Sequence, residues 1–502
     1  MATTTGQTEK GVSLKLLVNK DTNKVLFAEA GKDFVDVLFS FLTLPLGTIA
    51  RLVEKKSSMG PVSVGCLNKL YGSLREFDKE YTIMETTKEM LLQPKNSSEN
   101  YCSNLKLNID DTQPTKFFLC TMINGCSYPR YLNLSTNKKC GCVSYSNHTR
   151  SVSLKYSCNG FVKDGSSFVI TDNLVVIPNS VQFTSLGLLQ DLEINGSSSV
   201  KELTVTVTKD KVLDMLKCSL LSKTTLTDLF IRNKPSLENY KYFSCHQENN
   251  CNIQINVKLV IRKSDGKILY AQGEKDFADL LLGFLSFPLG GVVRVLGENC
   301  FVGNIDSLYK SIVDLDETKY LTSKDAKNRL VDCRLAAVFQ SIKHIVPIDY
   351  SRMDYYCFYQ GENYEQSVGN HKFFVSDVYR SDWGKYELFQ AELPKGSYEG
   401  YVKGPRAYMA TDDLVLTPWS PISALQLINQ LQIPLNDLQE MHVTIGVKEC
   451  LSVLKASLIS TSALTNGLCH LLPKVKEENV KSKLKVEVKE ELNIKQRLRK
   501  RV

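Results

Sequence analysis

Long apolar runs and export signals are missing from this sequence of 502 residues. A membrane-spanning helix needs about 20 apolar residues in succession, whereas the apolar stretches at residues 37–50 and 280–293 are shorter and are interrupted by a proline. The amino terminus has no basic segment followed by an apolar stretch and a small-residue cleavage site. We therefore expect buried core helices at both stretches, and a protein of the cytoplasm or nucleus that is not secreted.

Common catalytic signatures are also missing. The sequence contains no GxxxxGK[ST], GxGxxG or HExxH motif, which in other proteins build phosphate loops, dinucleotide sites and metalloprotease centres. Histidine is scarce and occurs at His148, His246, His344, His371, His442 and His470. None of these histidines matches another in the internal repeat described next, so no catalytic residue is assigned and an enzyme is the minority interpretation.

The most informative feature is an internal repeat. Residues 15–53 align without a gap on residues 258–296, with 17 identities in 39 positions. The correspondence continues from FVKDGSSFVITDNLVVIP to YVKGPRAYMATDDLVLTP and from LKCSLLSKTTLT to LKASLISTSALT. A unit of this length is far longer than solenoid repeats of about 20 to 50 residues, so we interpret it as a tandem duplication of a whole domain.

Two repeated blocks carry a family resemblance. KDFxDxLxxFLxxPLG near the start of each copy and LKxSLxSxxxLT near its end resemble a plant-specific family known as domain of unknown function 674. The resemblance covers nearly the whole chain except its two tails. It implies a plant origin and an intracellular setting, and it brings no activity, substrate or catalytic residue.

Each copy is predicted to be an α+β domain that opens with a β-hairpin followed by helices. Two β-rich runs at residues 14–18 and 25–28 flank a polar turn, which favours a hairpin. Pro45 and Pro288 interrupt the apolar runs that follow, so two helices are expected to meet at each proline. Strands that precede helices, without strict alternation, argue against a doubly wound parallel sheet.

These features predict two tandem homologous domains with flanking tails. The expected segments are a disordered N-terminal tail at 1–12, a first unit at 13–235 with a cysteine-rich loop at 120–142, a linker at 236–253, a second unit at 254–472, and a basic tail at 473–502. The second unit has lost the cysteine-rich loop.

One pair of aspartates recurs in both copies. Asp33 and Asp36 match Asp276 and Asp279, at the start of an apolar helix. The spacing is typical of a variant capping box, in which the first carboxylate caps the helix and the second lies in its positive first turn. A general acid and base pair is the alternative, and capping is favoured.

The sharpest chemical hypothesis is a zinc site. Four thiols in the loop could close one tetrahedral Zn²⁺ site, at Cys120, Cys126, Cys140 and Cys142. Their spacing departs from the usual pairs two to four residues apart, so four reduced thiols remain the alternative, and His148 or Cys158 could replace a ligand. In the alignment of the two copies, Cys357 matches Cys120, and the other three cysteines have no counterpart in the second copy. One structural zinc per chain is therefore predicted.

The basic charge is concentrated in the tail. Residues 473–502 carry 11 basic and 5 acidic residues, a local charge of +6 out of a net +8. A solvated extension is favoured, with a nuclear address or phosphate-contacting arm as the alternative.

The sequence as a whole leaves three function classes, in order of preference. The first is an interaction or scaffold protein with a protein partner, the second is a zinc-ribbon-like nucleic-acid binder, and the third is an enzyme with an unrecognised site.

Overall fold

The computed structural model describes most of the two predicted units. The described residues are 11–83, 85–114, 116–120, 149–153, 158–180, 187, 199–235, 254–297, 303–339, 344–350, 355–360, 372–376, 389–391 and 400–472. Within them, helices combine with two five-stranded antiparallel sheets, which confirms the α+β class. The linker, the C-terminal tail and residues 1–10 of the N-terminal tail lie outside the described residues and stay predictions, whereas Val12 already belongs to a strand. Below, the first half is the chain up to residue 235 and the second half begins at residue 254.

The first sheet contains the predicted N-terminal hairpin at its centre. Its strands run in the order β6 (Val176–Pro178), β5 (Ser167–Thr171), β2 (Lys24–Gly31), β1 (Val12–Asn19) and β7 (Val200–Val207). Alternate side chains of β1 are buried, as expected for a strand with one face on the core. The hairpin prediction is therefore confirmed, and its apolar face directs the following helices onto the sheet.

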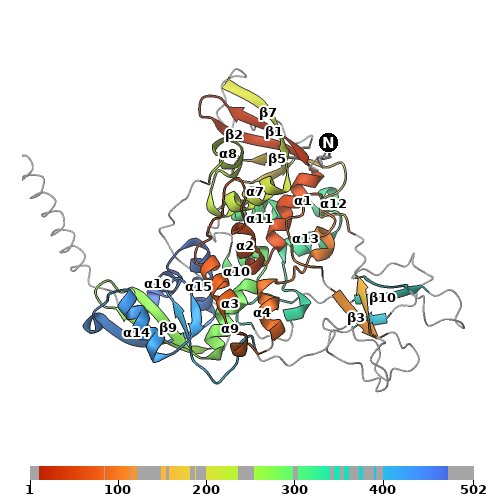
Figure 1. Cartoon of the computed structure of the whole chain (residues 1–502). Helices are drawn as coiled ribbons and strands as arrows, with labels where there is room; N and C mark the ends of the chain where they lie inside the picture. Colours follow the sequence, from red (N-terminus) through yellow and green to blue (C-terminus); the bar gives the residue numbers. More distant parts are fainter. Residues whose placement is uncertain are drawn as a thin grey trace, which may run out of the picture.

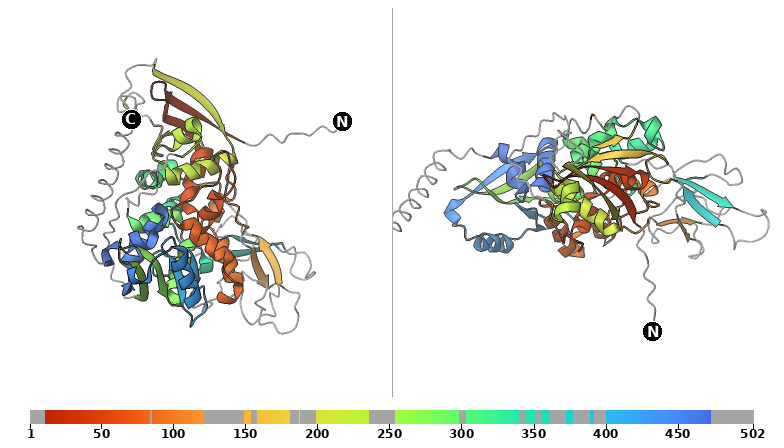
Figure 2. Two further views of the ribbon diagram at one scale, coloured as in Figure 1. Left: turned by 60° about the vertical axis from the view of Figure 1, so that its left-hand side comes forward. Right: turned by 90° about the horizontal axis from the view of Figure 1, so that it is seen from above.

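The second sheet has the same strand order. Its strands are β14 (Leu416–Pro418), β13 (Tyr408–Thr411), β9 (Ile268–Gly273), β8 (Ile255–Arg262) and β15 (Leu438–Ile445), in that order. Figure 1 shows the two sheets at opposite ends of the molecule with a layer of helices between them, and the views in Figure 2 agree. Each sheet thus has one face on a shared helical centre.

The apolar stretches form pairs of short helices that meet at a proline. They are α1 (Lys32–Ser40) and α2 (Leu46–Val53) in the first half, and α9 (Lys275–Gly283) and α10 (Leu289–Leu296) in the second. Pro45 and Pro288 are the N-caps of α2 and α10. The prediction that two helices meet at each proline is therefore confirmed. Residues 37–50 and 280–293 are buried throughout, and none of the described helices is long and apolar enough to cross a membrane.

A further helix follows the last strand of each sheet. It is α7 (Lys209–Leu221) after β7 and α15 (Val447–Ile459) after β15. The side chain of Thr208 caps α7 by accepting the N–H of Lys211. The apolar side chains of α7 at Val212, Leu213, Leu216 and Leu220 are buried.

The two halves exchange helices. In the first half, α3 (Leu67–Glu76) packs against β14 and α9 of the second half. Conversely, α11 (Ile305–Asp314) packs against β6 of the first half, and α13 (Lys324–Val331) packs against the turn between α1 and α2. One continuous apolar core therefore runs through both halves.

Backbone hydrogen bonds join the halves at the centre of this exchange. Leu46 donates its N–H to the carbonyl of Phe287 at 2.9 Å, and Leu289 donates to the carbonyl of Leu44 at 3.0 Å. These two bonds flank Pro45 and Pro288, which pair in an antiparallel bridge.

A second matched pair of bonds precedes the exchanged helices. Cys66 donates its N–H to the carbonyl of Ser457, and Asn304 donates to that of Ser219, both at 2.8 Å. The residue before each donor is a glycine with positive φ, Gly65 or Gly303, whose Cα approaches the same carbonyl too closely for a side chain.

The smaller elements complete the description. The helical ones are η1 (Phe41–Thr43), η2 (Lys79–Tyr81), α4 (Glu85–Leu92), α5 (Glu99–Cys102), α8 (Thr225–Thr227), η4 (Asp228–Arg232), η5 (Phe284–Ser286), α12 (Glu317–Tyr320), η6 (Ala337–Phe339), α14 (Pro421–Gln430), η8 (Leu435–Asp437), α16 (Ala463–Gly467) and η9 (Cys469–Leu471). Strands β3 (Lys116–Cys120) and β4 (Thr149–Ser153) pair, and β11 (Lys372–Ser376), β10 (Tyr355–Gln360) and β12 (Phe389–Ala391) form a three-stranded sheet.

Candidate functional site

The repeated aspartates do not cap their helices. Helix α1 begins after Gly31, and no side chain accepts a hydrogen bond at its N-cap. Asp33 lies in the positive first turn, where a carboxylate is favourable. The capping prediction was wrong because Asp33, the predicted cap, is the second residue of the helix. Asp36 lies one turn further along and is buried, and its carboxylate reaches a distant loop.

Asp36 accepts three hydrogen bonds, two of them from that loop. Its Oδ1 accepts the backbone N–H groups of Phe161 at 2.7 Å and Val162 at 2.9 Å. Its Oδ2 accepts from the Lys32 ammonium at 2.7 Å. The loop can approach because Gly160 has φ +80°, and a Cβ there would overlap the carboxylate. The carboxylate thus fastens residues more than 120 positions away in sequence.

The second half repeats this arrangement. Asp279 accepts the N–H groups of Tyr401 at 2.6 Å and Val402 at 3.0 Å, and the ammonium of Lys275 at 2.8 Å. Gly400, at φ +132°, again leaves no room for a side chain against the carboxylate. Two copies of one constellation therefore occur, and we call each an Asp–loop clasp.

Electrostatics set the Asp–loop clasp apart from a surface ion pair. Burial raises the pKa of Asp36 above its ordinary value, although Lys32 and the two backbone N–H groups act in the opposite direction. The Lys32 ammonium also donates to the carbonyls of Asn159 at 2.5 Å and Val162 at 2.8 Å. All three protons of the ammonium are thereby used, so the pair is satisfied within the protein.

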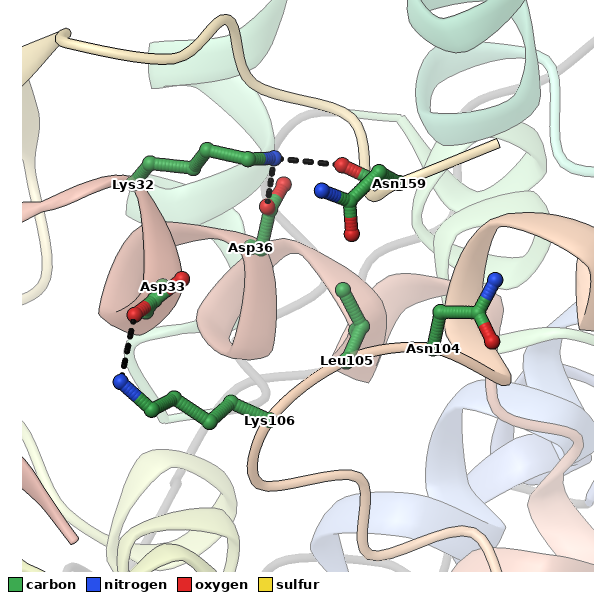
Figure 3. A pocket seen from close by; sticks show the side chains of 7 residues that line it. All are labelled: Lys32, Asp33, Asp36, Asn104, Leu105, Lys106 and Asn159. Carbon is green, nitrogen blue, oxygen red and sulfur yellow. Dashed lines mark hydrogen bonds and ion pairs between the residues drawn. The ribbon is translucent and has the colours of Figure 1, made fainter. Parts of the chain in front are cut away.

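A polar pocket of about 520 Å³ adjoins the first clasp. It is lined by Lys32, Asp33, Asp36, Asn104, Leu105, Lys106 and Asn159. Figure 3 shows Lys32 turned toward Asp36 and Asn159, and Lys106 paired with Asp33 at 3.1 Å. The charged side chains of this lining form two ion pairs, Lys32 with Asp36 and Lys106 with Asp33. None of the seven lining residues is a histidine, cysteine or serine.

The other half completes each clasp. Val162 pairs with Leu321 in an antiparallel bridge, and Thr322 donates its N–H to the carbonyl of Phe161 at 2.8 Å. In the reciprocal place Val402 pairs with Thr82. The loop held by each aspartate is therefore also held by the exchanged helical segment, which makes the clasp part of the junction between halves.

Among the described residues, a buried lysine lies next to two serines, an arrangement that could activate a nucleophile. Lys217 on α7 is fully buried, and its ammonium lies 2.5 Å from the Ser57 hydroxyl. Burial lowers the pKa of Lys217. The same ammonium donates to the carbonyls of Lys55 and Gly60, and Asp214 accepts from Ser57 and Ser58. With three acceptors the nitrogen has no lone pair to offer Ser57, so this cluster binds a loop.

A largely buried histidine, His344, packs among aromatic side chains. His344 contacts Phe287, Tyr350 and Tyr401, and its Nε2 lies 3.3 Å from the Tyr401 hydroxyl. Burial lowers the pKa of His344 to about 4, which keeps the imidazole neutral at physiological pH.

The predicted zinc ligands lie almost wholly outside the described residues. Cys120 ends strand β3, opposite Thr149, whereas Cys126, Cys140, Cys142 and the substitute His148 fall outside the described part of the chain. Within the described ranges, no three His, Cys, Asp or Glu residues gather as metal ligands would. The zinc site therefore stays a prediction.

The structural role of Lys32, Gly160 and their counterparts was missed from the sequence. Their signal was present: Lys and Gly recur at matched positions, in KDFxD and in GFVK and GYVK. The contact between those two blocks was not visible, because a side chain that reaches across more than 120 residues has no local periodicity.

Taken together, the fold and the repeated clasp define an α+β protein whose shared polar residues hold its own loops. A family model described as "Protein of unknown function (DUF674)" matches residues 8–448. The chain therefore belongs to this family, as its repeated blocks indicated. No curated protein and no solved structure matches it.

Proposed function

We propose that this protein is a non-enzymatic interaction protein of the plant cell interior. The observation that carries the proposal is a set of exposed apolar side chains on α14 and the segment after it. Ile422, Leu425, Leu431 and Leu435 are 70%, 52%, 47% and 68% exposed. Among the described residues these are the large apolar side chains that face solvent, and we call them the outer apolar face.

The buried polar groups also favour an interaction function over an enzymatic one. The polar groups that both halves share are occupied in holding loops and the junction between halves. An apolar face that remains exposed on an otherwise well-buried protein is typical of a surface that binds another protein. Figure 1 shows α14 at the outer edge of the molecule, where a partner has access.

Photo-cross-linking tests the proposal. A photo-reactive phenylalanine analogue replaces Leu425 in the full chain in plant cells, and a control chain carries it at Glu76, whose side chain is 85% exposed on α3. We expect a discrete cross-linked species from position 425 that is absent from position 76. No adduct at 425, or the same adducts at both positions, would contradict the proposal.

We also propose that the two halves arose by tandem duplication. The matched strand orders, the two Asp–loop clasps and the paired backbone bonds at the prolines support a common origin. The proposed units remain 13–235 and 254–472, each completed by helices of the other.

One structural zinc per chain, bound by Cys120, Cys126, Cys140 and Cys142, is a separate proposal. Metal analysis of the purified chain should give one zinc, which a double variant Cys140→Ser and Cys142→Ser loses. Purified protein that contains no zinc and in which all fifteen thiols titrate would reject this proposal.

Nucleic-acid binding through residues 473–502 is the alternative function. Absence of RNA and DNA binding at low salt would reject that alternative.

A further inference from the structure

We propose that the outer apolar face binds the same face of a second copy of this chain. This inference rests on the proposed interaction function and names its partner. It follows from how the face is built, how it is charged and how large it is.

The face is held rigidly before any partner arrives. On its inner side α14 packs Ala424 and Ile428 against the sheet residues Leu269, Tyr270 and Met409. The helix begins with a capping box between Ser420 and Ser423, with Pro421 at its first position. A surface ordered in this way loses little conformational entropy when it binds.

The helix carries apolar side chains on both its inner and its outer side. Ala424 and Ile428 point to the sheet, whereas Ile422 and Leu425 on the same helix are exposed. A helix that only covers a sheet shows a polar outer side. The exposed apolar residues are therefore not needed for packing within the chain, and they predict contact with another apolar surface.

The absence of charge favours a second copy as the partner. Residues 414–436 contain no Asp, Glu, Lys or Arg, in a chain of which 23% is charged. In a two-fold symmetric dimer, the same surface of each copy forms the interface. A charged residue near the axis therefore lies opposite the same charge of the second copy, and this repulsion opposes association. A surface without charges avoids that repulsion, and it offers nothing to attract a charged partner.

The neighbouring turn is electrically balanced as well. Arg262 pairs with Asp265, and Lys263 donates to the carbonyl of Asn436 at 2.9 Å. Asp437 accepts the N–H of Ser264 at 2.9 Å. Two cations and two anions thus border the face, so the rim adds little repulsion between copies.

The size of the face predicts a weak dimer. A standard interface buries about 800 Å² per partner, which four partly exposed side chains cannot supply alone. The glutamines and asparagines between them, Gln426, Asn429, Gln430 and Gln432, are exposed and would complete the contact. We expect dissociation constants in the micromolar range.

Sedimentation of the purified full chain tests this inference. We expect a concentration-dependent shift from the 56.5 kDa monomer toward twice that mass. The double variant Ile422→Glu and Leu435→Glu should stay monomeric at all concentrations, and the uncharged variant Ile422→Gln and Leu435→Gln should weaken the dimer at least tenfold. Thr22→Glu, at an exposed hairpin turn of the other half, serves as the matched control and should associate like the native chain.

The outcomes separate the inference from the proposed function. A native chain that stays monomeric to 100 µM, or variants that associate like the native chain, would overturn self-association. If the analogue at position 425 then cross-links a protein of different mass in cells, the interaction function stands without the self-partner. An adduct of twice the chain mass supports both.

Discussion

The hydroxyl of Tyr101 in the first half donates to the carboxylate of Asp325 in the second half at 2.9 Å. Tyr101 also stacks on Phe161, next to the loop that Asp36 holds. Arg329 donates to the carbonyl of Ser97 at 2.8 Å in the same region. The exchanged helices, the Asp–loop clasp and the loop therefore belong to one connected structure.

Removing the buried carboxylate should destabilise the protein much more than removing its exposed neighbour. Asp36→Asn leaves the ammonium of Lys32 buried without its anion, and we expect a loss of about 3 kcal/mol in the free energy of unfolding. Asp33→Asn removes a half-exposed pair with Lys106 and should cost below about 1 kcal/mol. Urea unfolding of both variants measures the difference, and equal losses would contradict the clasp.

The glycine before each clasped loop should not tolerate a side chain. Gly160→Ala brings its Cβ into the Asp36 carboxylate and strains a positive φ, so we expect a loss of more than about 3 kcal/mol. Gly165→Ala is the matched control, because φ is +77° there and nothing lies within 4 Å of the added atom. It should cost only about 1 to 2 kcal/mol. Thermal unfolding of both variants tests this, and similar losses would show that the close approach is unimportant.

Stability should fall in acid because of His344. Its pKa is lowered to about 4 in the folded protein, below about 6.5 in the unfolded chain. The unfolded state therefore binds more protons between these values, so this contribution is complete above pH 6.5 and is lost as the pH falls toward 4. Asp36 and Asp279, whose pKa values are raised, act in the opposite direction.

Comparison with a variant isolates the histidine. His344→Gln should flatten the dependence of the free energy of unfolding on pH between 6.5 and 4, where one histidine contributes at most about 1.4 kcal/mol per pH unit. Urea unfolding at several pH values measures the slopes. A variant with the same slope as the native chain would mean that His344 does not titrate as described.

Local patterns in the sequence were enough to predict the strands and helices but not which distant segments they contact. Two β-rich runs and the polar turn between them predicted the hairpin of β1 and β2, and Pro45 predicted where α1 and α2 separate. The capping prediction failed because α1 begins after Gly31, which leaves Asp33 inside its first turn. The contact of Asp36 with a loop more than 120 residues away could not be predicted, because spacing along a helix reports only neighbours within a turn. The exchange of α3 and α11 was likewise invisible, since packing between halves leaves only ordinary amphipathic helices in the sequence.

The buried lysine on α7 should hold the loop before α3. Lys217→Met removes three donors to residues 55–60, including the carbonyl of Gly60, and leaves Asp214 buried beside two serines. We expect faster amide hydrogen exchange in that loop and a loss of about 2 to 4 kcal/mol. Lys55→Met is the control, because Lys55 is exposed. Unchanged exchange in Lys217→Met would contradict the assignment.

Cleavage of the linker is the most direct test of the central claim, that the two halves form one interlocked body. A site for a sequence-specific protease is placed within residues 236–253 of the full chain, and the folded protein is cleaved. We predict that the two fragments elute together, unfold in a single transition, and separate only in denaturant, because α3 and α11 each pack against the opposite half. Fragments that separate in native buffer, each still folded, would contradict the account.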